Sequence, residues 1–568
     1  MPSFLTSTQP WSAFLKDTDA HQQLAEAILL PYVNTCRWFA GKARQQMGIR
    51  VDTVLALAGT GQQPFYLLIL DTRYADGEPE QYLLPLAFVA DRTDVPDKGV
   101  LVEANFSGTP GTLVDAIYVA GFREALFQHM AANDTVDQPG DSASGSSASG
   151  ESASGTLVFQ RGRGLVDAET GATLTSRVLP VDSSNSALVF GYALPGQPSG
   201  ELFFLKLYRK LFEQTNPEVE MVAFLTETGG FGAIPAYAGR FTWQRSDEAG
   251  RQPDITLGMM QRMVPNDKDS WAMTGDYLND FLYAVPNRLF AVKEDVFEKV
   301  ALLGRRTAEM HLALYAKTDD PAFQSEPFTD DYRRFLTGRF SDLLERRYDL
   351  LVNNYDRLDA QAQRLAWVFM EAKEMIDDFV ADFQTRWLGS CRIRVHGDYH
   401  LGQVLAVGDH TGHRDYVVID FEGEPESTIT DRKIKHSPLK DVAGMIRSYH
   451  YAVSAKLFNS VETEGIDPDK LQIVSDRWYK LIRDTYLDAY LDTFGSPHPM
   501  FYDNGEINYL LLIYLLEKAV YELGYEISYR PTWVKIPLKG IVDVIREIEK
   551  LQPGGHHRQM ASAPLHLV

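Results

Sequence analysis

The first half of the chain alternates short apolar runs with turn-forming residues, a pattern typical of β-strands. Pro64–Asp71 and Gln81–Val89 are predicted to be neighbouring strands across a turn, and Val51–Leu57 is predicted to be a further strand. A segment with helical periodicity, Asp19–Tyr32, precedes them. The N-terminal region is therefore expected to be a sheet that follows a helical start.

The pattern changes from strands to helices along the chain. Short β-type segments dominate between residues 156 and 265, with one helix-like stretch near Pro217–Thr228. From about residue 275 onward, apolar positions recur with the period of an α-helix in Val296–Tyr315, Asp330–Leu351, Ala360–Phe383 and Asp469–Phe494. A β-rich half followed by a helix-rich half predicts an α+β, two-lobed protein-kinase-like fold with a β-rich N-lobe and a largely helical C-lobe.

Three regions follow from this reading: residues 1–110, a β-rich region over 111–264, and a helical C-lobe over 265–568. The repetitive Ser/Ala/Gly segment 141–155 has nothing to bury and is predicted to be flexible. It could be a linker between domains or a loop inserted within one domain. The inserted loop is preferred, because strand-like sequence resumes at once in Thr156–Phe159.

Composition narrows the classes of protein to consider. The chain has 568 residues with 45% hydrophobic and 23% charged residues, which is typical of a globular protein of several domains. Its formal net charge of -22 argues against non-specific binding to nucleic acid or to anionic membranes. Two cysteines, Cys36 and Cys391, cannot build a disulfide framework, and the start of the chain lacks a signal-type apolar core. We therefore expect a cytoplasmic protein.

The most informative stretch is His396-Gly-Asp-Tyr-His-Leu-Gly-Gln403, which is followed by Val417-Val-Ile-Asp-Phe-Glu422. It places Asp398 and Asp420 beside short apolar runs, with Gln403 five positions after the first acid. In protein kinases the same jobs fall to H-R-D-x-x-x-x-N and D-F-G. Any one of these residues alone would be read as a turn or a capping residue. Together they predict a phosphoryl-transfer site.

Phosphoryl transfer needs a carboxylate that orients the acceptor hydroxyl and oxygen ligands for the Mg²⁺ that bridges the phosphates. Asp398 is the predicted catalytic base. Gln403 and Asp420 are the predicted metal ligands, with Glu422 as a further one. His396 is expected to brace the loop rather than to transfer protons.

A nucleotide grip should lie in the β-rich half. The polar turn that enters the strand ending at Tyr192 supplies the candidates Ser183, Ser184, Asn185 and Ser186. Backbone N–H groups and small hydroxyls can surround phosphates without glycines, although an ordinary hairpin turn has the same composition. The pattern G-x-x-x-x-G-K-[ST] does not occur near it, so this is not a Walker-type site.

A single cation, Lys206, lies in the apolar strand Leu202–Tyr208. A lysine buried there needs a partner, and phosphate oxygens and a helix carboxylate would supply one. Glu220 is the preferred partner and Glu218 the second choice; an edge-strand lysine in solvent is the alternative. The strand ending at Pro265 is expected to be the hinge, where Gln261 and Met263 would face the adenine.

Several stretches of the chain resemble the bacterial maltokinases, which have an aminoglycoside-phosphotransferase-like, eukaryotic-protein-kinase-like fold. They are Arg37-Trp-Phe-Ala-Gly-Lys42, Asp182–Ser186, His396–Gln403, Ile419–Pro425, Asp441–Ser448, Tyr521–Glu526 and Arg530–Trp533. Two departures are Ala40, where the family usually has Gly, and Tyr399, where Leu is commoner. The resemblance covers nearly the whole chain.

The resemblance implies an N-terminal cap subdomain and ATP-dependent phosphorylation of maltose at its anomeric hydroxyl, giving maltose 1-phosphate for α-glucan or glycogen synthesis. Many relatives are fused to a trehalose synthase domain, so a functional association with that enzyme is implied, while this chain resembles the stand-alone form. The candidate substrate-binding residues are His396, Tyr521, Glu522, Tyr525, Glu526 and Arg530. For Arg37, Trp38 and Lys42, packing of the cap is at least as well supported as contact with substrate.

Two further readings stay open. Another acceptor, such as glucosamine or an aminoglycoside, would need carboxylates that face its amine, and Glu522 or Glu526 could supply them. A catalytically silent nucleotide-binding scaffold would be expected to lack at least one of Lys206, Asp398, Gln403 and Asp420, and all four are present.

Overall fold

In the computed structural model the chain forms two compact units. The first unit comprises residues 1–228 and 235–264, and the second comprises 229–234 and 265–568. The structure describes residues 4–59, 64–138, 155–180, 184–196, 200–245, 253–266, 268–285, 292–315, 317–408, 414–459, 467–495 and 498–551. Most of the expected Ser/Ala/Gly insert, residues 141–154, and the C-terminal tail lie outside these ranges.

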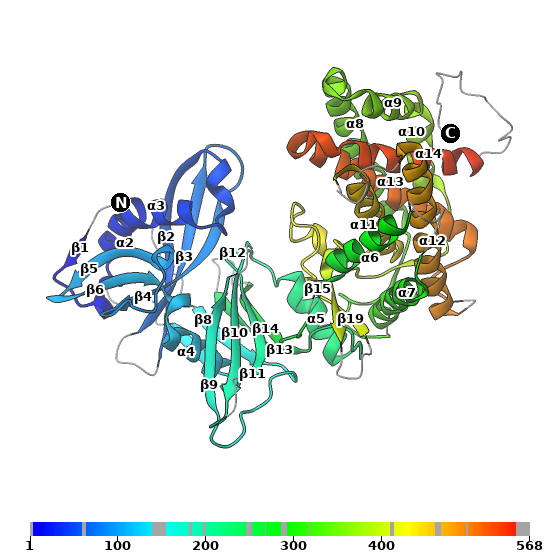
Figure 1. Ribbon diagram of the computed structural model, residues 1–568. Helices are drawn as coiled ribbons and strands as arrows, with labels where there is room; N and C mark the ends of the chain where they lie inside the picture. Colours follow the sequence, from blue (N-terminus) through cyan, green and yellow to red (C-terminus); the bar gives the residue numbers. More distant parts are fainter. Residues whose placement is uncertain are drawn as a thin grey trace. The chain divides into compact units, whose positions relative to one another are not determined.

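The first unit begins with a seven-stranded, mainly antiparallel sheet (Figure 1). Its strands run in the order β1 (Leu5–Ser7), β5 (Val100–Phe106), β6 (Thr109–Asp115), β4 (Glu80–Val89), β3 (Phe65–Tyr74) and β2 (Gln46–Leu57), with β12 (Lys210–Leu211) also paired to β4. The predicted neighbouring strands are confirmed, because β3 and β4 pair with Asp71 opposite Gln81. The boundary expected after residue 110 falls inside β6, so the chain leaves this sheet only at Asp115.

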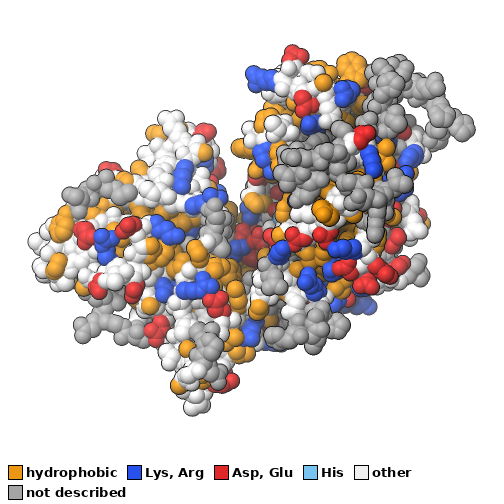
Figure 2. Space-filling view, viewed as in Figure 1, with side chains coloured by type: hydrophobic (Ala, Val, Ile, Leu, Met, Phe, Trp, Pro, Cys, Tyr) orange, Lys and Arg blue, Asp and Glu red, His pale blue; other side chains and the backbone are white. Residues whose placement is uncertain are grey.

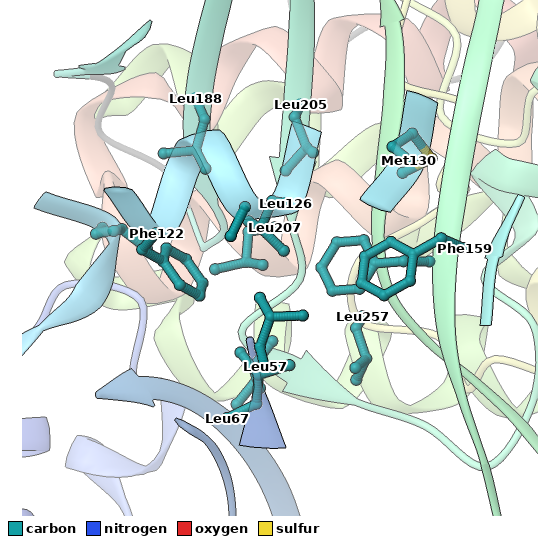
Figure 3. Close-up of a cluster of buried hydrophobic side chains, with 14 of the residues drawn as sticks. Leu57, Leu67, Phe122, Leu126, Met130, Phe159, Leu188, Leu205, Leu207 and Leu257 are labelled. Atoms are coloured by element: carbon teal, nitrogen blue, oxygen red, sulfur yellow. The ribbon is translucent and has the colours of Figure 1, made fainter. Parts of the chain in front are cut away.

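Both faces of this first sheet are covered. One face packs against the N-terminal helical segments α1 (Trp11–Phe14), α2 (Thr18–Leu24), the π-helical turn Ala25–Leu29 and α3 (Leu30–Thr35). The other face shares a core with α4 (Ala120–Ala132) and with the second sheet, as Figure 3 shows for Leu57, Leu67, Phe122 and Leu257. Alternate residues of β3 divide between the two cores, since Leu68 belongs to the first and Leu67 to the second. The continuous apolar run of β3 thus reflects burial on both sides.

The second sheet of this unit also has seven strands. Their order is β7 (Thr135–Gln138), β8 (Gly155–Arg161), β13 (Tyr237–Arg245), β14 (Asp254–Arg262), β11 (Gly200–Leu207), β10 (Ser186–Ala193) and β9 (Thr173–Leu179). Helix α5 (Pro217–Glu227) starts where the sequence predicts, with Pro217 in the first turn and the Asn216 side chain capping its N-terminus.

The second unit is largely helical, as predicted. Its helices are α6 (Ser270–Ala284), α7 (Glu294–Leu314), α8 (Asp330–Asn354), α9 (Ala360–Glu371), α10 (Lys373–Thr385), α11 (Leu439–Asn459), α12 (Pro468–Phe494), α13 (Asn504–Tyr529) and α14 (Lys535–Leu551). The single helix expected over Ala360–Phe383 is wrong. Ala372, with ψ of 2°, leaves the helical conformation there and separates α9 from α10, while the apolar periodicity continues across the break.

Two small sheets support the second unit. The first is β15 (Lys268–Asp269), β18 (Val404–Gly408) and β19 (Arg414–Val418), and the second is β16 (Glu326–Pro327) with β17 (Cys391–Arg392). None of the helices that the structure describes is both long and apolar enough to cross a membrane. Acidic and basic side chains are interspersed over the visible face of each unit (Figure 2).

Candidate functional site

The loop that carries Asp398 runs from β17 to β18 in the second unit. Gly397 has φ of 85°, a left-handed conformation that favours glycine, and it turns the chain just before Asp398. The carboxylate of Asp398 stays partly accessible, with 20% of the side chain exposed. The sequence placed His396 among the substrate-binding candidates, but this residue is buried and its Nε2 is hydrogen-bonded to the carbonyl oxygen of Ile419 at 2.9 Å. His396 therefore braces the loop.

Residues on one face of α11 contact the backbone of this loop. The carboxylate of Asp441 accepts hydrogen bonds from the backbone N–H groups of His396 at 2.8 Å and Gly397 at 2.9 Å. One turn later, a Cβ at Gly444 would lie 2.5 Å from the carbonyl oxygen of Tyr399, so only glycine fits there. After a further turn, Ser448 Oγ accepts from the N–H of Leu401 at 3.1 Å.

These three contacts explain the spacing of the Asp441–Ser448 block, because positions three and seven residues apart share a helix face. Asp441 positions the loop that carries Asp398 and is fully buried with His311, whose Nε2 lies 3.1 Å from its carboxylate. Burial alone would raise the pKa of Asp441, but these hydrogen bonds outweigh it and hold the pKa below its ordinary value.

Tyr399 lies where the family that the chain resembles more often has Leu, and its hydroxyl is hydrogen-bonded to other buried hydroxyl groups. The Tyr399 hydroxyl is hydrogen-bonded to Thr307 Oγ1 at 2.9 Å, and Tyr486 donates to the same oxygen at 3.1 Å. Thr307 lies on α7 and Tyr486 on α12, so a tyrosine here ties the loop to two helices. The tyrosine hydroxyl thus adds buried hydrogen bonds that a leucine could not make.

Asp420 and Gln403 come together at the base of the β18–β19 hairpin. Gln403 Nε2 donates to Asp420 Oδ2 at 2.9 Å, and the N–H of Ile419 donates to the Gln403 carbonyl at 3.0 Å. Asp420 has φ of 66°, which is rare for a residue with a side chain and is typical of strained functional positions. The Asp420 loop also touches the Asp398 loop, because a Cβ at Gly397 would lie 3.3 Å from Cα of Gly423.

The donor set at this point suits a hard cation. Gln403, Asp420 and Glu422 offer carboxamide and carboxylate oxygens, which are the ligands that Mg²⁺ prefers. Glu422 lies 3.9 Å from Arg432. The residues present therefore fit a magnesium site.

The first unit carries a lysine–glutamate pair. Lys206 Nζ lies 2.9 Å from Glu218 Oε2, and the hydroxyl of Tyr208 donates to the same oxygen at 2.8 Å. The sequence preferred Glu220 as the partner and gave Glu218 as the second choice; the structure shows Glu218 in a pair with Lys206. Asn216 caps α5 by accepting from the N–H of Glu218, so this residue lies at the first turn of the helix, where its carboxylate is almost fully buried.

The side chains of the polar turn before β10 differ in their contacts and exposure. Ser186 is buried, and its Oγ accepts from Arg209 Nε at 2.8 Å, while Asn185 Oδ1 accepts from the N–H of Arg209 at 3.4 Å. Ser184 is exposed. Ser183 lies outside the described residues. The structure thus leaves Ser184 as the described hydroxyl of this turn that faces solvent, and gives Ser186 a structural contact.

The expected hinge strand is β14. Gln261 pairs with Phe204 of β11 and with Tyr237 of β13, so its backbone is part of the sheet. The N–H of Met263 donates to the carbonyl oxygen of Leu202 at 2.8 Å. That N–H is therefore engaged within the protein.

The substrate candidates near the C-terminus lie on α13 and just after it. Glu522 accepts from Arg447 Nε at 3.0 Å, and Glu526 accepts from Tyr451 at 2.8 Å and from Arg530 at 2.6 Å. These two carboxylates connect α13 to α11 and to Arg530, while Glu526 Oε2 is buried without a hydrogen-bond partner among the described residues. Tyr525 is 41% exposed.

The aromatic and cationic groups here also contact one another. The guanidinium of Arg530 lies 5.2 Å from the ring centre of Tyr525 and 4.8 Å from that of Trp533. The rings of Tyr525 and Tyr529 contact each other with their centres 4.9 Å apart and their planes tilted by 44°. Exposed aromatic rings of this kind can pack against a sugar.

Sequence reasoning missed Lys518. This residue lies on α13, and its Nζ is 3.3 Å from Asp398 Oδ1. The signal available in the sequence was a lysine that follows Glu517 at the end of the apolar stretch Tyr509–Leu516, three residues before Tyr521.

The signature Arg37–Lys42 is a packing element of the first unit. Trp38 is buried, and the guanidinium of Arg209 lies 4.7 Å from its ring centre. A Cβ at Gly41 would meet the hydroxyl of Tyr74 at 2.2 Å, which explains the glycine of the signature. Lys42 and Arg37 are exposed on this segment.

Comparison with known proteins agrees with the resemblance. Residues 32–118 match the maltokinase N-terminal cap domain. A glucosamine kinase from Streptacidiphilus jiangxiensis is 26% identical over 390 residues, which are 67% of this chain and 77% of that protein. A glucosamine kinase from Mycolicibacterium smegmatis is 26% identical over 367 residues, 64% of this chain and 77% of that protein.

The solved structure of a glucosamine kinase in complex with glucosamine, ADP and inorganic phosphate matches with a TM-score of 0.59 at 21% identity, over 95% of this chain and 100% of that chain. A second glucosamine kinase structure, in crystal form A, matches with a TM-score of 0.57 at 21% identity, over 87% of this chain and 91% of that chain. The predicted fold class is thereby confirmed. The chain matches the maltokinase cap domain in its N-terminal region and has the kinase-like fold of the glucosamine kinases, as the resemblance of its motifs predicts.

Proposed function

We propose that the protein is a Mg-ATP-dependent sugar kinase that transfers the γ-phosphoryl group of ATP to a sugar hydroxyl, with maltose as its acceptor and maltose 1-phosphate as its product. One observation carries this proposal. Asp398 and the Asp420–Gln403 pair come from two loops in backbone contact at Gly397 and Gly423, so a base and an all-oxygen metal site lie together.

In the proposed mechanism Asp398 accepts a hydrogen bond from the acceptor hydroxyl and takes its proton as the phosphorus–oxygen bond forms. Gln403, Asp420 and Glu422 would hold Mg²⁺, which neutralises charge on the phosphates when it is bound. Lys206, held by Glu218, contributes positive charge to the phosphates. Catalysis is then mainly positioning and charge stabilisation.

The remaining assignments concern the edges of the site. Ser183, Ser184 and Asn185 would contact the nucleotide phosphates, and Gln261 would lie near the adenine. Tyr521 and Tyr525 would stack on the sugar. Maltose is preferred because the cap domain and the motifs around α13 resemble those of maltokinases.

Glucosamine is the second candidate acceptor. It is favoured by the names of the relatives, which are glucosamine kinases. The acceptors differ in charge, because glucosamine carries an ammonium group and maltose does not.

A direct assay separates these possibilities. The purified protein is given Mg-ATP with maltose, glucose, glucosamine or kanamycin, and ADP release and the phosphorylated carbon are followed by coupled assay and NMR. We expect acceptor-dependent ADP release with maltose and a phosphate ester at its anomeric carbon. Asp398→Asn should lower kcat by about 10²- to 10⁴-fold, whereas Asp349→Asn, a matched change at an exposed position of α8, should leave it unchanged. Turnover of glucosamine alone would favour the second candidate, and no acceptor-dependent turnover would overturn the proposal.

A further inference from the structure

Lys518 is the cation that lies against the predicted catalytic base. Its Nζ is 3.3 Å from Asp398 Oδ1, and 27% of its side chain is exposed. Burial favours the neutral amine, but the negative charges of Asp398, Glu424 and Glu522 outweigh burial and raise the pKa of Lys518 above its ordinary value. The group is therefore an ammonium at neutral pH.

Two of the carboxylates near Lys518 are matched with other cations. Glu522 is paired with Arg447, and Glu526 is paired with Arg530. Glu424 accepts a hydrogen bond from Ser427 Oγ at 3.3 Å, and its charge acts on Lys518. Glu426 is exposed, where solvent screens its charge. A second ammonium beside Asp398 would be repelled by the Lys518 ammonium, which already pairs with that carboxylate.

The distance between two such ammonium groups follows from the chemistry. A general base lies within hydrogen-bond reach of the hydroxyl that it deprotonates, so an amine on the neighbouring carbon comes within roughly 6–9 Å of Lys518 Nζ. At an effective dielectric constant of about 20, repulsion over that distance corresponds to roughly 20- to 100-fold in relative affinity.

We propose that Lys518 is a specificity-determining residue, which disfavours acceptors that carry an ammonium next to the phosphorylated hydroxyl and so restricts the site to neutral sugars. This inference rests on the proposed sugar-kinase function and deepens it. It predicts that this chain disfavours glucosamine, the acceptor after which its relatives are named, and an acceptor assay can test that prediction directly.

The test compares two acceptors within each variant. The ratio of kcat/KM for glucose to that for glucosamine is measured at pH 6.5 for the wild type, Lys518→Met, Lys518→Arg and Lys440→Met. Lys440 of α11 is a matched control, because it is a second lysine beside α13 and lies 3.9 Å from Glu517, the residue before Lys518. We expect the ratio to fall by roughly 20-fold or more in Lys518→Met and to stay at the wild-type value in Lys518→Arg and Lys440→Met.

The pH dependence gives a second readout that a purely structural lysine would not produce. The amine of glucosamine is expected to titrate near the α-amino range, about 7.7–8.0, and discrimination by the wild type should decline as the pH rises through that range. Lys518 stays charged there, and burial lowers the pKa of His400, so that ring is already neutral. The titratable groups that face Lys518 are Asp398, His400, Tyr521, Glu424 and Glu522.

The outcomes separate this inference from the proposed function. Equal losses for both sugars in Lys518→Met, with an unchanged ratio, would overturn the specificity role while leaving the kinase intact. If no sugar is phosphorylated, binding of glucose and glucosamine is measured by calorimetry with a non-hydrolysable ATP analogue. A binding ratio that Lys518→Met leaves unchanged overturns the inference there as well, and a ratio that shifts toward glucosamine supports it.

Discussion

The molecule contains two lysine–carboxylate pairs that are alike in chemistry and differ in structure. Lys206 and Glu218 in the first unit are 2.9 Å apart, and only 2% of the Glu218 side chain is exposed. Lys518 and Asp398 in the second unit are 3.3 Å apart, and 20% of the Asp398 side chain is exposed. The first carboxylate also accepts from Tyr208 and lies in a capped helix turn.

From this difference we infer a structural role for the Lys206–Glu218 pair. In the Lys518–Asp398 pair, the carboxylate can still accept a hydrogen bond from a substrate. Glu218 Oε2 is shared by Lys206 and Tyr208, and we expect this carboxylate to place Lys206. Asp398 keeps accessible surface for a further donor, and its loop is held through the backbone by α11 rather than through the carboxylate. The backbone is fixed while the carboxylate is left available.

The largest expected effect comes from Asp398→Asn. Loss of a general base typically costs about 10²- to 10⁴-fold in rate, so we expect kcat to fall by that amount while ATP affinity and thermal stability stay near the wild type. If the activity remained and the stability fell instead, the Lys518–Asp398 pair would be structural, and the comparison would be broken.

Glu218→Gln should have the opposite profile. It removes the charge partner of Lys206 in a buried place, so we expect the free energy of unfolding to fall by about 1–3 kcal/mol together with a weaker affinity for ATP. Chemical denaturation and nucleotide titration measure the two effects. If Glu218→Gln were as stable as Asp398→Asn, the two pairs would contribute equally to stability, and the comparison would fail.

Gly444→Ala tests how the catalytic loop is supported. The added methyl group would press on the carbonyl of Tyr399, so we expect a loss of stability of about 1–3 kcal/mol and a lower kcat with an unchanged KM for ATP. Gly338→Ala is the matched control, because a Cβ at this position of α8 meets nothing within 4 Å. That change should stabilise the helix by about 0.5–1 kcal/mol.

The smallest expected effect concerns folding stability at acid pH, which limits the pH range in which both pairs can be compared. Burial lowers the pKa of His436 well below its ordinary value, and the charges of Lys440, Arg339 and Arg392 add to the shift. The unfolded chain binds a proton below about pH 6.5 that the folded chain rejects, so stability is lost as the pH falls, by up to about 1.4 kcal/mol per pH unit.

His436→Gln should make this acid-side slope shallower, although the buried His450, whose pKa is also lowered by burial, keeps part of it. Urea unfolding between pH 5 and 7.5 measures the slope. An identical slope in the variant would contradict the assignment to His436.

Much of the fold and part of the site could be predicted because their signals are local. The spacing of Asp398, Gln403 and Asp420 lies within one short stretch, and the structure brings Gln403 and Asp420 into contact. Strand alternation and helix periodicity are likewise local, and β3, β4 and α5 begin and end near the predicted residues.

The rest depended on how elements rotate against one another. Glu218 and Glu220 lie two positions apart, so which one meets Lys206 depends on the orientation of α5 about its axis. Lys518 reads as a solvated lysine until α13 packs beside the Asp398 loop. The partner of Met263 N–H depends on Leu202, which is some sixty residues away in the chain.

The two-sided burial of β3 has a consequence for how this chain could be dissected. Leu67 and Ile69 contribute to one core while Leu68 and Leu70 contribute to another. Cutting the chain after the cap would expose a large apolar face on both fragments, and such surfaces favour aggregation. The cap is thus no detachable module, and a shortened enzyme would need polar replacements along α4 and the facing strands before it could stay in solution.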